Sequence, residues 1–485
     1  MSSLPDILSV EVMPTVDTMS IKTEVLDPIT ISDTECSFQI PRNGILDGGS
    51  FVSLAVTTDG NDGFLPCKTG IYSLIKSAHL LIGSKEISSC TDCGHYETLI
   101  KQFSTPEHRA YVDSVKSGRS MDRFVEVDAA NGLLMPLDMD YTTFATDASA
   151  EAFVPPNLKP TPSDATTPVF SVPLSDLIPM MKTRKLPLMA IEENVFLRLV
   201  FQTQSARDDG TILCYPNGSA SSGVVVPSKV NIKFYSDHLY YSDDTMNQFM
   251  SQVYSDTGMQ YLYEDQILTV AQVPSTANPA VDTVTEQRVE RDVAVSGRTV
   301  RSLLVTEKFT ALADNNGRNI LGEYVSNDME TDTAYNWRIN DQRKYDRDVT
   351  RPSHKYTELN QVVGAPLQVP SQFYSYDVDT DKSNAANKLN QNSVYIGKLE
   401  GYQLPNRTNS FVGNDLRCTS HYIGLDMTLS GSNFLGNGKK VGSKPIILSK
   451  TYKRTNGKNE AREMRIYASV ERLMTLRNGT VVVSA

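Results

Sequence analysis

Hydrophobic alternation with a period of two is the feature that most constrains how this chain folds. Residues 195–201 and 464–470 place apolar side chains at every second position. Residues 71–82 carry a similar run, which Gly83-Ser84 interrupts before residues 85–87. Because successive side chains of a strand point to opposite faces, these runs predict strands with one buried face, and the interrupted run predicts a β-hairpin. The buried face expected for residues 71–82 holds Tyr72, Leu74, Ala78, Leu80 and Ile82.

Helical periodicity is limited to two short runs with i, i+3, i+4, i+7 spacing. The two runs are Tyr96, Leu99, Ile100 and Phe103, and Met246, Phe249, Met250 and Val253. Asp243 and Asp244 precede the second run and are candidate N-caps. Each run covers about three helical turns. We therefore expect short helices that decorate a β-protein.

Long polar segments separate the strand-like runs. They span residues 142–168, 205–228, 312–334 and 376–392. Loops beyond about 12–15 residues are uncommon in compact domains and usually carry function or partner contacts. We therefore expect these four segments to carry function or partner contacts.

The length of 485 residues exceeds the size of one hydrophobic core, which stops growing near about 250–300 residues. Two large domains or one doubled architecture are therefore expected. The chain has no run of about 18 apolar residues, which predicts no membrane insertion. The start of the sequence lacks the basic flank and apolar core of a secretory signal, and the six cysteines form no regular framework. The first observation predicts synthesis and residence in the cytosol, and the second is typical of a reducing compartment.

Nucleic-acid binding is disfavoured by the formal net charge of −11, because the average surface repels phosphate. One cluster of basic residues keeps a local binding patch open as an alternative. It consists of Lys439, Lys440, Lys444, Lys450, Lys453 and Arg454. The cluster is spread through a Gly/Ser/Asn-rich segment, so a solvated loop and strand edge is the favoured interpretation.

Cys90 and Cys93, followed by His95, have the spacing of half a zinc site. A second pair of ligands is missing nearby. We therefore predict a turn after the hairpin and no structural metal.

A calcium loop is suggested by the spacing of Asp377, Asp379 and Asp381. However, Lys382 stands where the loop needs a glycine, and Lys388 stands where it needs a bidentate glutamate. The segment is therefore predicted to be a solvated acidic loop.

Catalytic motifs are missing from the sequence, which contains no GxSxG, HExxH or GxxxxGK[ST]. The histidines are scattered and none lies in a recognisable triad context; they are His79, His95, His108, His238, His354 and His421. We predict no catalytic, cofactor-binding or metal-binding residue, no cofactor and no enzymatic activity. Distant residues that the fold brings together leave an enzyme open as an alternative.

A family resemblance begins with Val172-Pro173-Leu174, then residues 186–191 (LPLMAI), then the strand-like run 195–201. These stretches resemble, in order, a passage of the double jelly-roll major capsid proteins of nucleocytoplasmic large DNA viruses, virophages and polinton-like viruses. Further stretches resemble the same family in the same order: residues 81–87, residues 230–241 with Asp243 and Phe249, residues 339–345, and residues 464–468 with Leu473 and Gly479. Asp341 departs from the glycine of the family pattern. The N-terminal signature usual in the capsid proteins of algal large viruses is missing, which favours a virophage-like or polinton-like relative.

The resemblance implies an all-β fold of two consecutive eight-stranded jelly rolls with short helices and long loops. Two such barrels also explain the chain length and the alternating runs. The expected organisation is an N-terminal arm at 1–17, a first jelly roll at 18–242, a linker helix at 243–262 and a second jelly roll at 263–485.

The resemblance also implies a major capsid protein that forms pseudo-hexagonal homotrimeric capsomers in an icosahedral virion shell assembled inside the host cell. Its expected partners are further copies of itself, neighbouring capsomers, and penton and minor or cement proteins, without specific nucleic-acid binding. The four long segments are expected to form outward towers and contacts between subunits. The alternatives are a double jelly-roll scaffold protein of membrane-containing virus assembly, and a jelly-roll sugar-binding protein or enzyme.

Overall fold

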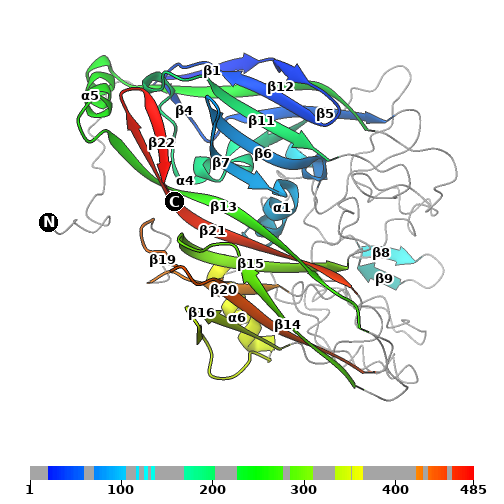
Figure 1. The fold of residues 1–485 in the computed structure, drawn as a ribbon. Coiled ribbons are helices and arrows are strands. Elements are labelled where there is room, and N and C mark those ends of the chain that lie inside the picture. Colours follow the sequence, from blue (N-terminus) through cyan, green and yellow to red (C-terminus); the bar gives the residue numbers. More distant parts are fainter. Residues whose placement is uncertain are drawn as a thin grey trace.

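The computed structural model is dominated by β-sheets with a few short helices (Figure 1). It describes residues 20–58, 70–104, 116–118, 125–128, 133–136, 169–202, 227–276, 284–309, 334–350, 352–363, 422–429, 435–455 and 461–484. The all-β prediction is confirmed.

The first barrel consists of two five-stranded sheets. The first outer sheet has the order β1-β12-β5-β10, with β4 paired to β12; its strands are β1 (Ser20–Leu26), β4 (Ile45–Leu46), β5 (Phe51–Thr58), β10 (Val169–Pro173) and β12 (Pro227–Tyr240). The first inner sheet has the order β2-β3-β11-β6-β7; its strands are β2 (Thr30–Ile31), β3 (Glu35–Ile40), β6 (Ile75–Ile82), β7 (Lys85–Thr91) and β11 (Val195–Phe201). β1 and β12 pair antiparallel although Ser20 and its partner Tyr240 lie far apart in sequence, so this barrel closes only when distant strands meet.

The second barrel repeats this plan with a six-stranded and a four-stranded sheet. The second inner sheet has the order β13-β21-β15-β18, with β19 on β15 and β22 on β21; its strands are β13 (Met259–Val273), β15 (Thr299–Phe309), β18 (Ile423–Asp426), β19 (Lys439–Lys440), β21 (Arg462–Arg477) and β22 (Thr480–Ser484). The second outer sheet has the order β14-β20-β16-β17; its strands are β14 (Val284–Val293), β16 (Ala334–Ile339), β17 (Gln342–Arg343) and β20 (Ile446–Thr455). A separate hairpin pairs β8 (Val125–Asp128) with β9 (Leu133–Pro136).

The helices are short and lie around the barrels. They are η1 (Gly70–Leu74), α1 (Cys93–Ser104), α3 (Leu174–Leu177), α4 (Met180–Thr183), η4 (Leu188–Ala190), α5 (Asp243–Val253) and α6 (Pro352–Val363). None of the described helices is long and apolar enough to cross a membrane.

The four sheets follow one another as layers, from the first outer sheet through the two inner sheets to the second outer sheet (Figure 1). Each barrel buries its own core between its two sheets. In the first core, the rings of Phe38 and Phe234 face each other from the two sheets, with centroids 5.8 Å apart. The second core contains Trp337, the only tryptophan of the chain, which is fully buried.

The hairpin predicted around Gly83-Ser84 is confirmed, because β6 and β7 pair antiparallel across this turn. Gly83 has φ +58°, a left-handed conformation that favours glycine. The prediction that Tyr72 and Leu74 continue the strand is wrong. They belong to η1, whose five residues are all buried, and a fully buried apolar run has no exposed face by which sequence could distinguish a strand from a helix.

Both predicted helices are confirmed as α1 and α5. The prediction that Asp243 and Asp244 are N-caps is wrong, because Ser242 is the N-cap residue and the two aspartates form the first turn. Carboxylates in the first turn still stabilise a helix, since they face the positive end of its dipole.

The region between the barrels has an organisation that the sequence did not reveal. α5 follows β12 and β13 begins at Met259, inside the predicted linker of residues 243–262. Val253 of α5 packs into the first core, and so do Met474 and Val481 from the C-terminal hairpin β21–β22. The second inner sheet thus completes the core of the first barrel. The predicted arm at 1–17 lies outside the described residues.

Candidate assembly surfaces

The strand registers give each barrel a polarity. In the first barrel, Thr58 at the end of β5 lies opposite Pro227 at the start of β12. In the second barrel, Val273 and Phe309, the last residues of β13 and β15, both lie opposite Arg462 at the start of β21. The long connections therefore leave and re-enter at one end of each barrel.

Tight turns and helix α5 occupy the other end. Ser20, where the described chain begins, pairs with Tyr240 just before α5. Asn478 and Gly479 form the β21–β22 turn, and the amide of Glu192 donates a hydrogen bond of 3.0 Å to the Gly479 carbonyl. In Figure 1 this end of the molecule, with α5 and β22, lies at the left.

The predicted loops 142–168, 205–228, 312–334 and 376–392 lie outside the described residues, except at two margins. Residues 227 and 228 belong to β12, and residue 334 begins β16. The role of these loops stays a prediction.

The contact region between the first barrel and the second inner sheet, called the seam from here on, has an apolar part and a polar part. Two helices build the apolar part. Leu99 of α1 and Leu359 of α6 pack with Leu304 and Tyr467 of the second inner sheet. At Gly424 of β18, an added Cβ would lie 2.7 Å from the Cα of Leu359, so only glycine permits this close approach. The helices therefore fill the space between the first barrel and the second inner sheet.

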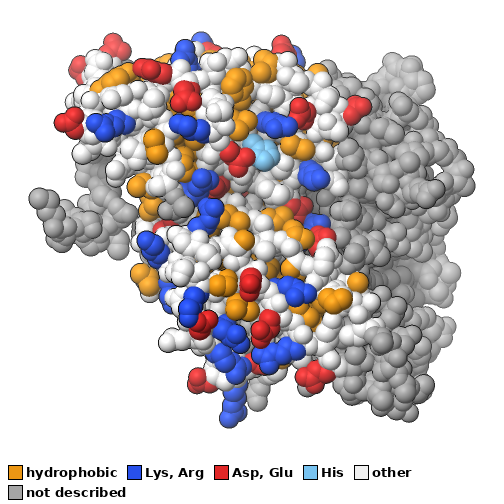
Figure 2. All heavy atoms as spheres, in the orientation of Figure 1, with side chains coloured by type: hydrophobic (Ala, Val, Ile, Leu, Met, Phe, Trp, Pro, Cys, Tyr) orange, Lys and Arg blue, Asp and Glu red, His pale blue; other side chains and the backbone are white. Residues whose placement is uncertain are grey.

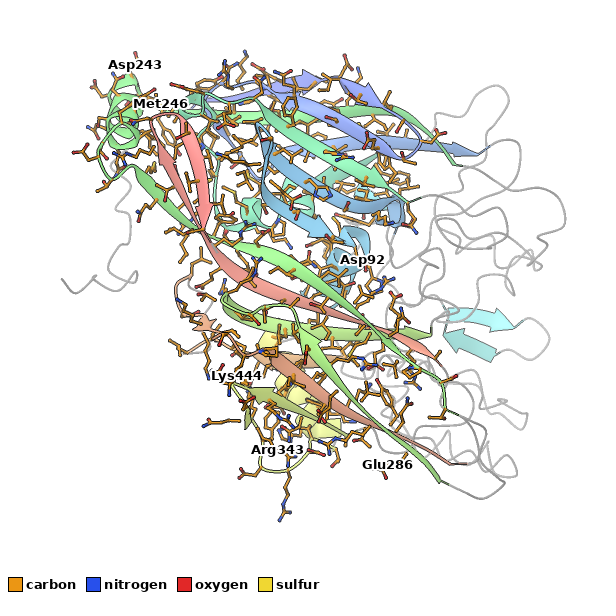
Figure 3. All side chains as sticks on the ribbon, viewed as in Figure 1. Asp92, Asp243, Met246, Glu286, Arg343 and Lys444 are labelled. Atoms are coloured by element: carbon orange, nitrogen blue, oxygen red, sulfur yellow. The ribbon has the colours of Figure 1, made fainter. Side chains whose placement is uncertain are left out.

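A polar contact beside these helices joins α1 to the second inner sheet. Asp92, at the β7–α1 junction, accepts hydrogen bonds from the Tyr467 hydroxyl at 2.5 Å and from Arg465 Nη1 at 2.7 Å. Asp92 is labelled in Figure 3, where it lies near α1. Its φ of +56° is left-handed, which aspartate tolerates better than most residues. Burial raises the pKa of Tyr467 well above its usual range, so the hydroxyl keeps the proton that it donates.

A second polar contact joins β7 to the same sheet. Asp265 of β13 accepts from Arg472 Nη1 at 2.6 Å and from Ser88 Oγ at 2.9 Å. Burial raises the pKa of Asp265, and Arg472 and Ser88 oppose this shift. The Cys90 thiol donates to Gln266 Oε1 at 2.6 Å. These contacts fix the two barrels as one block, because a buried polar group that lost its partner would cost about 1–3 kcal/mol.

Cys90, Cys93 and His95 are all buried beside this seam. The Cys93 thiol donates to the Asp176 carbonyl at 3.6 Å. Within the described ranges, no group of three or more histidine, cysteine or acidic side chains could hold a metal ion. That Cys90 and Cys93 bind no metal stays a prediction.

Of the remaining candidate residues, those that the structure describes lie in separate places. Asp377, Asp379, Asp381, Lys382, Lys388, His108 and His421 lie outside the described residues. His79 pairs with Glu86 at 2.8 Å on the first inner sheet, His238 Nδ1 lies 2.8 Å from the Asn43 carbonyl, and His354 lies 3.6 Å from Glu358 on α6.

The predicted basic cluster divides into different environments. Lys439 and Lys440 are exposed on the short edge strand β19, and Lys444 pairs with Asp341. The solvated interpretation is wrong for Lys450, whose side chain is 2% exposed. Lys450 alternates along β20 with the outward Ser449 and therefore points into the second barrel. The side chains of Lys453 and Arg454 lie outside the described part of the chain.

A buried charge network inside the second barrel was missed by sequence reasoning. The Glu307 carboxylate of β15 forms an ion pair with Lys450 Nζ at 2.8 Å and accepts a hydrogen bond from the Tyr452 hydroxyl at 2.7 Å. Arg462 Nη1 lies 3.7 Å from the same carboxylate. Lys450 Nζ and the Arg462 guanidinium also lie 4.5 and 4.9 Å from the centre of the Tyr452 ring. The inward position of Lys450 in the alternation was the signal that could have found this network.

The charges of this network depend on one another. Burial opposes the ionisation of Glu307, but Lys450 and Arg462 outweigh burial and lower its pKa. Burial lowers the pKa of Lys450, and it lowers that of Arg462 to about 10. Glu307 in turn opposes the lowering of the pKa of both cations, so the three groups favour one another's charged forms. Because they lie near the strand ends where the long connections begin, the network fixes that end of the second barrel.

Comparisons with known proteins agree with this architecture. No protein-family model matches the sequence, and no curated protein matches it. Among solved structures, the fold is similar to PBCV-1 VP54 fitted into a reconstruction of the virophage Sputnik, with a TM-score of 0.55, 13% identity and coverage of 96% of this chain and 97% of that chain.

Two further structures give comparable likeness. The Sputnik virophage structure matches with a TM-score of 0.50 and 12% identity, over 96% of this chain and 88% of that chain. The Faustovirus major capsid protein matches with a TM-score of 0.50 and 10% identity, over 95% of this chain and 91% of that chain. The chain therefore has the double jelly-roll fold found in viral major capsid proteins, as predicted. The virophage-like or polinton-like affinity stays a prediction, because these scores are close to one another.

Proposed function

We propose that the chain is a major capsid protein whose homotrimer forms a pseudo-hexagonal capsomer of an icosahedral virion shell. The observation that carries the proposal is the pair of similarly built barrels held side by side by the buried seam. Three such chains around a threefold axis give six similar blocks, which lets a trimer occupy a sixfold lattice position.

The polarity of the barrels supports the same function. We assign the end with the long connections to the outside of the shell, where loops can form towers and subunit contacts without a core of their own. The end with α5 and the tight turns then faces inward. In this assignment residues 18–242 and 263–485 are the two jelly rolls, residues 243–262 are the linker helix, and residues 1–17 are the N-terminal arm.

The chemistry of the described residues supports a structural role over an enzymatic one. Buried ion pairs join separate elements of the fold: Arg465 pairs with Asp92 across the seam, Arg472 with Asp265 between β21 and β13, and Lys450 with Glu307 inside the second barrel. The proposed location is the virion, after assembly inside the host cell, with neighbouring capsomers and penton and minor or cement proteins as partners.

Sedimentation velocity of the purified protein tests the trimer. We expect a species of three times the monomer mass at micromolar concentration, in low and in high salt. A stable monomer under all these conditions would contradict the proposal and favour a jelly-roll binding protein or enzyme.

A further inference from the structure

The two outer sheets each have a face that the seam leaves unused. In the layered arrangement the outer sheets lie on opposite sides of the molecule, and their outward faces point away from each other (Figure 1). A closed ring of identical chains requires each chain to offer two different, complementary faces. These two faces are therefore the first candidates for contact between copies.

The outward face of the first outer sheet carries an apolar row that crosses four strands. The registers align Val25 of β1 with Tyr235 of β12, Tyr235 with Phe51 of β5, and Phe51 with Pro173 of β10. Their inward neighbours Phe234, Val52 and Val172 belong to the first core. Because side chains alternate, the four residues of the row point outward and the core does not need them.

The row has the character of a protein contact surface. The rings of Phe51 and Tyr235 stack with centroids 4.7 Å apart and an interplanar angle of 10°. Of the nine exposed large hydrophobic residues in the described part of the chain, three lie on this sheet: Ile21 and Val25 on β1, and Val169 on β10. Contiguous exposed apolar surface of this kind marks interaction sites.

The outward face of the second outer sheet has a different chemistry. Along β14, Val289 and Val293 are buried, whereas Arg288, Glu290 and Asp292 are exposed. Glu290 lies 3.4 Å from Arg288 and 3.6 Å from Arg338 of β16. None of the nine exposed hydrophobic residues lies on this sheet. Figure 2 shows charged side chains of both signs gathered over the second barrel.

The two faces complement each other. Planar guanidinium groups stack on aromatic rings, and arginine and aromatic residues are both enriched in interfaces. Two chains of net charge −11 repel each other on average, and the uncharged row together with the arginines offers contact with little repulsion.

The area of the first face is sufficient for a major part of an interface. Four strands about 4.8 Å apart, over seven residues of about 3.3 Å each, cover about 450 Å². A standard interface buries about 800 Å² per partner. The outward face of the first outer sheet, which carries the row, therefore supplies about half of such a contact.

We propose that the apolar row Val25–Tyr235–Phe51–Pro173 binds the second outer sheet of a second copy, with Arg288 and Arg338 stacked against the Phe51–Tyr235 pair. This inference rests on the proposed capsomer and names the surfaces through which its copies meet.

Charge substitutions on the two faces test the pairing. The variant Val25→Lys with Tyr235→Lys places cations against Arg288 and Arg338, and we expect the dissociation constant of the trimer in sedimentation equilibrium to rise about 100-fold. Adding Arg288→Glu and Arg338→Glu to the same chain restores association by at least about tenfold, because opposite charges then face each other.

Two controls keep the result interpretable. Leu429→Lys changes another exposed hydrophobic residue, 77% exposed and away from both faces, and leaves association unchanged. Circular dichroism spectra equal to that of the wild type verify that both barrels of each variant are folded.

The outcomes separate this inference from the proposed function. A wild-type trimer that the lysine variant does not weaken overturns the inference and leaves the capsomer standing, whereas a wild-type monomer overturns the capsomer. If the lysine variant dissociates and the glutamate substitutions do not restore the trimer, a surface other than the second outer sheet binds the apolar row, which also overturns the inference. Retention of single- or double-stranded DNA by wild type, lost with Arg288→Glu and Arg338→Glu, assigns the arginines to nucleic acid instead.

Discussion

Replacing Glu307 by glutamine removes the carboxylate that Lys450 and Arg462 share inside the second barrel. The Glu307→Gln variant keeps the size of the side chain and an acceptor for the Tyr452 hydroxyl, so the change is mainly electrostatic. Glu307 and Lys450 are 1% and 2% exposed, so water screens their interaction little. Removing one partner of a buried ion pair costs about 3–5 kcal/mol, and we expect about 3 kcal/mol because the hydrogen bond persists.

The single tryptophan makes the measurement specific to this barrel, since Trp337 lies in the second core. At a urea dependence of about 3 kcal/mol per molar, a loss of about 3 kcal/mol lowers the midpoint of the Trp337 fluorescence transition by about 1 M. Asp341→Asn is the surface control, because Asp341 is 57% exposed and its ion pair with Lys444 is a surface pair. Its expected effect is below about 0.5 kcal/mol.

The pH dependence of the unfolding free energy tests the role of Glu307 independently. The pKa of Glu307 is lowered in the folded protein, so its stabilisation is complete above the ordinary glutamate pKa of about 4.3. It disappears as the pH falls through the lowered value of the folded state. The difference between wild type and Glu307→Gln is therefore largest at neutral pH and shrinks in acid. A midpoint shift below about 0.3 M at pH 7, equivalent to less than about 1 kcal/mol, would refute this reasoning.

Three further changes examine the seam, the shared core and the cysteines. Leu99→Ala opens a cavity between the barrels and costs about 2–5 kcal/mol; calorimetry should show two separate transitions for the variant, and an unchanged single transition would contradict the tight seam. Met474→Ala should lower the Trp337 midpoint although Met474 lies in the first core, because the seam makes the two barrels unfold together; an unchanged midpoint would contradict the tight seam. Burial raises the pKa of Cys36 to about 12 and that of Cys90 well above its usual range. Because the thiolate is the reactive form and all three side chains are buried, Cys36, Cys90 and Cys93 should resist alkylation at pH 8 with or without a chelator. Labelling of Cys90 and Cys93 that appears only with the chelator would reveal a bound metal.

Local sequence patterns were sufficient for elements with one exposed face. The alternation at 195–201 and the turn at Gly83 predicted strands and a hairpin because one side of each strand meets solvent or a polar neighbour. Residues 71–74 were wrongly predicted to be a strand. Every side chain there is buried, so the sequence pattern does not distinguish an exposed face from a buried one.

Contacts between distant segments could not be read from the sequence. Asp92 and Tyr467 meet only because the second inner sheet packs against α1, and no local spacing relates them. The same holds for Val481, which completes the first core from the last strand. Lys450 was recoverable in principle, because its position between Leu448 and Tyr452 in the alternation points it inward.

Electron microscopy of the purified protein tests the proposed capsomer most directly. We predict particles with threefold symmetry and six barrel-sized densities around the axis, which close into shells when the protein assembles. Particles that contain only two barrels, or dimers with twofold symmetry, would contradict the proposal.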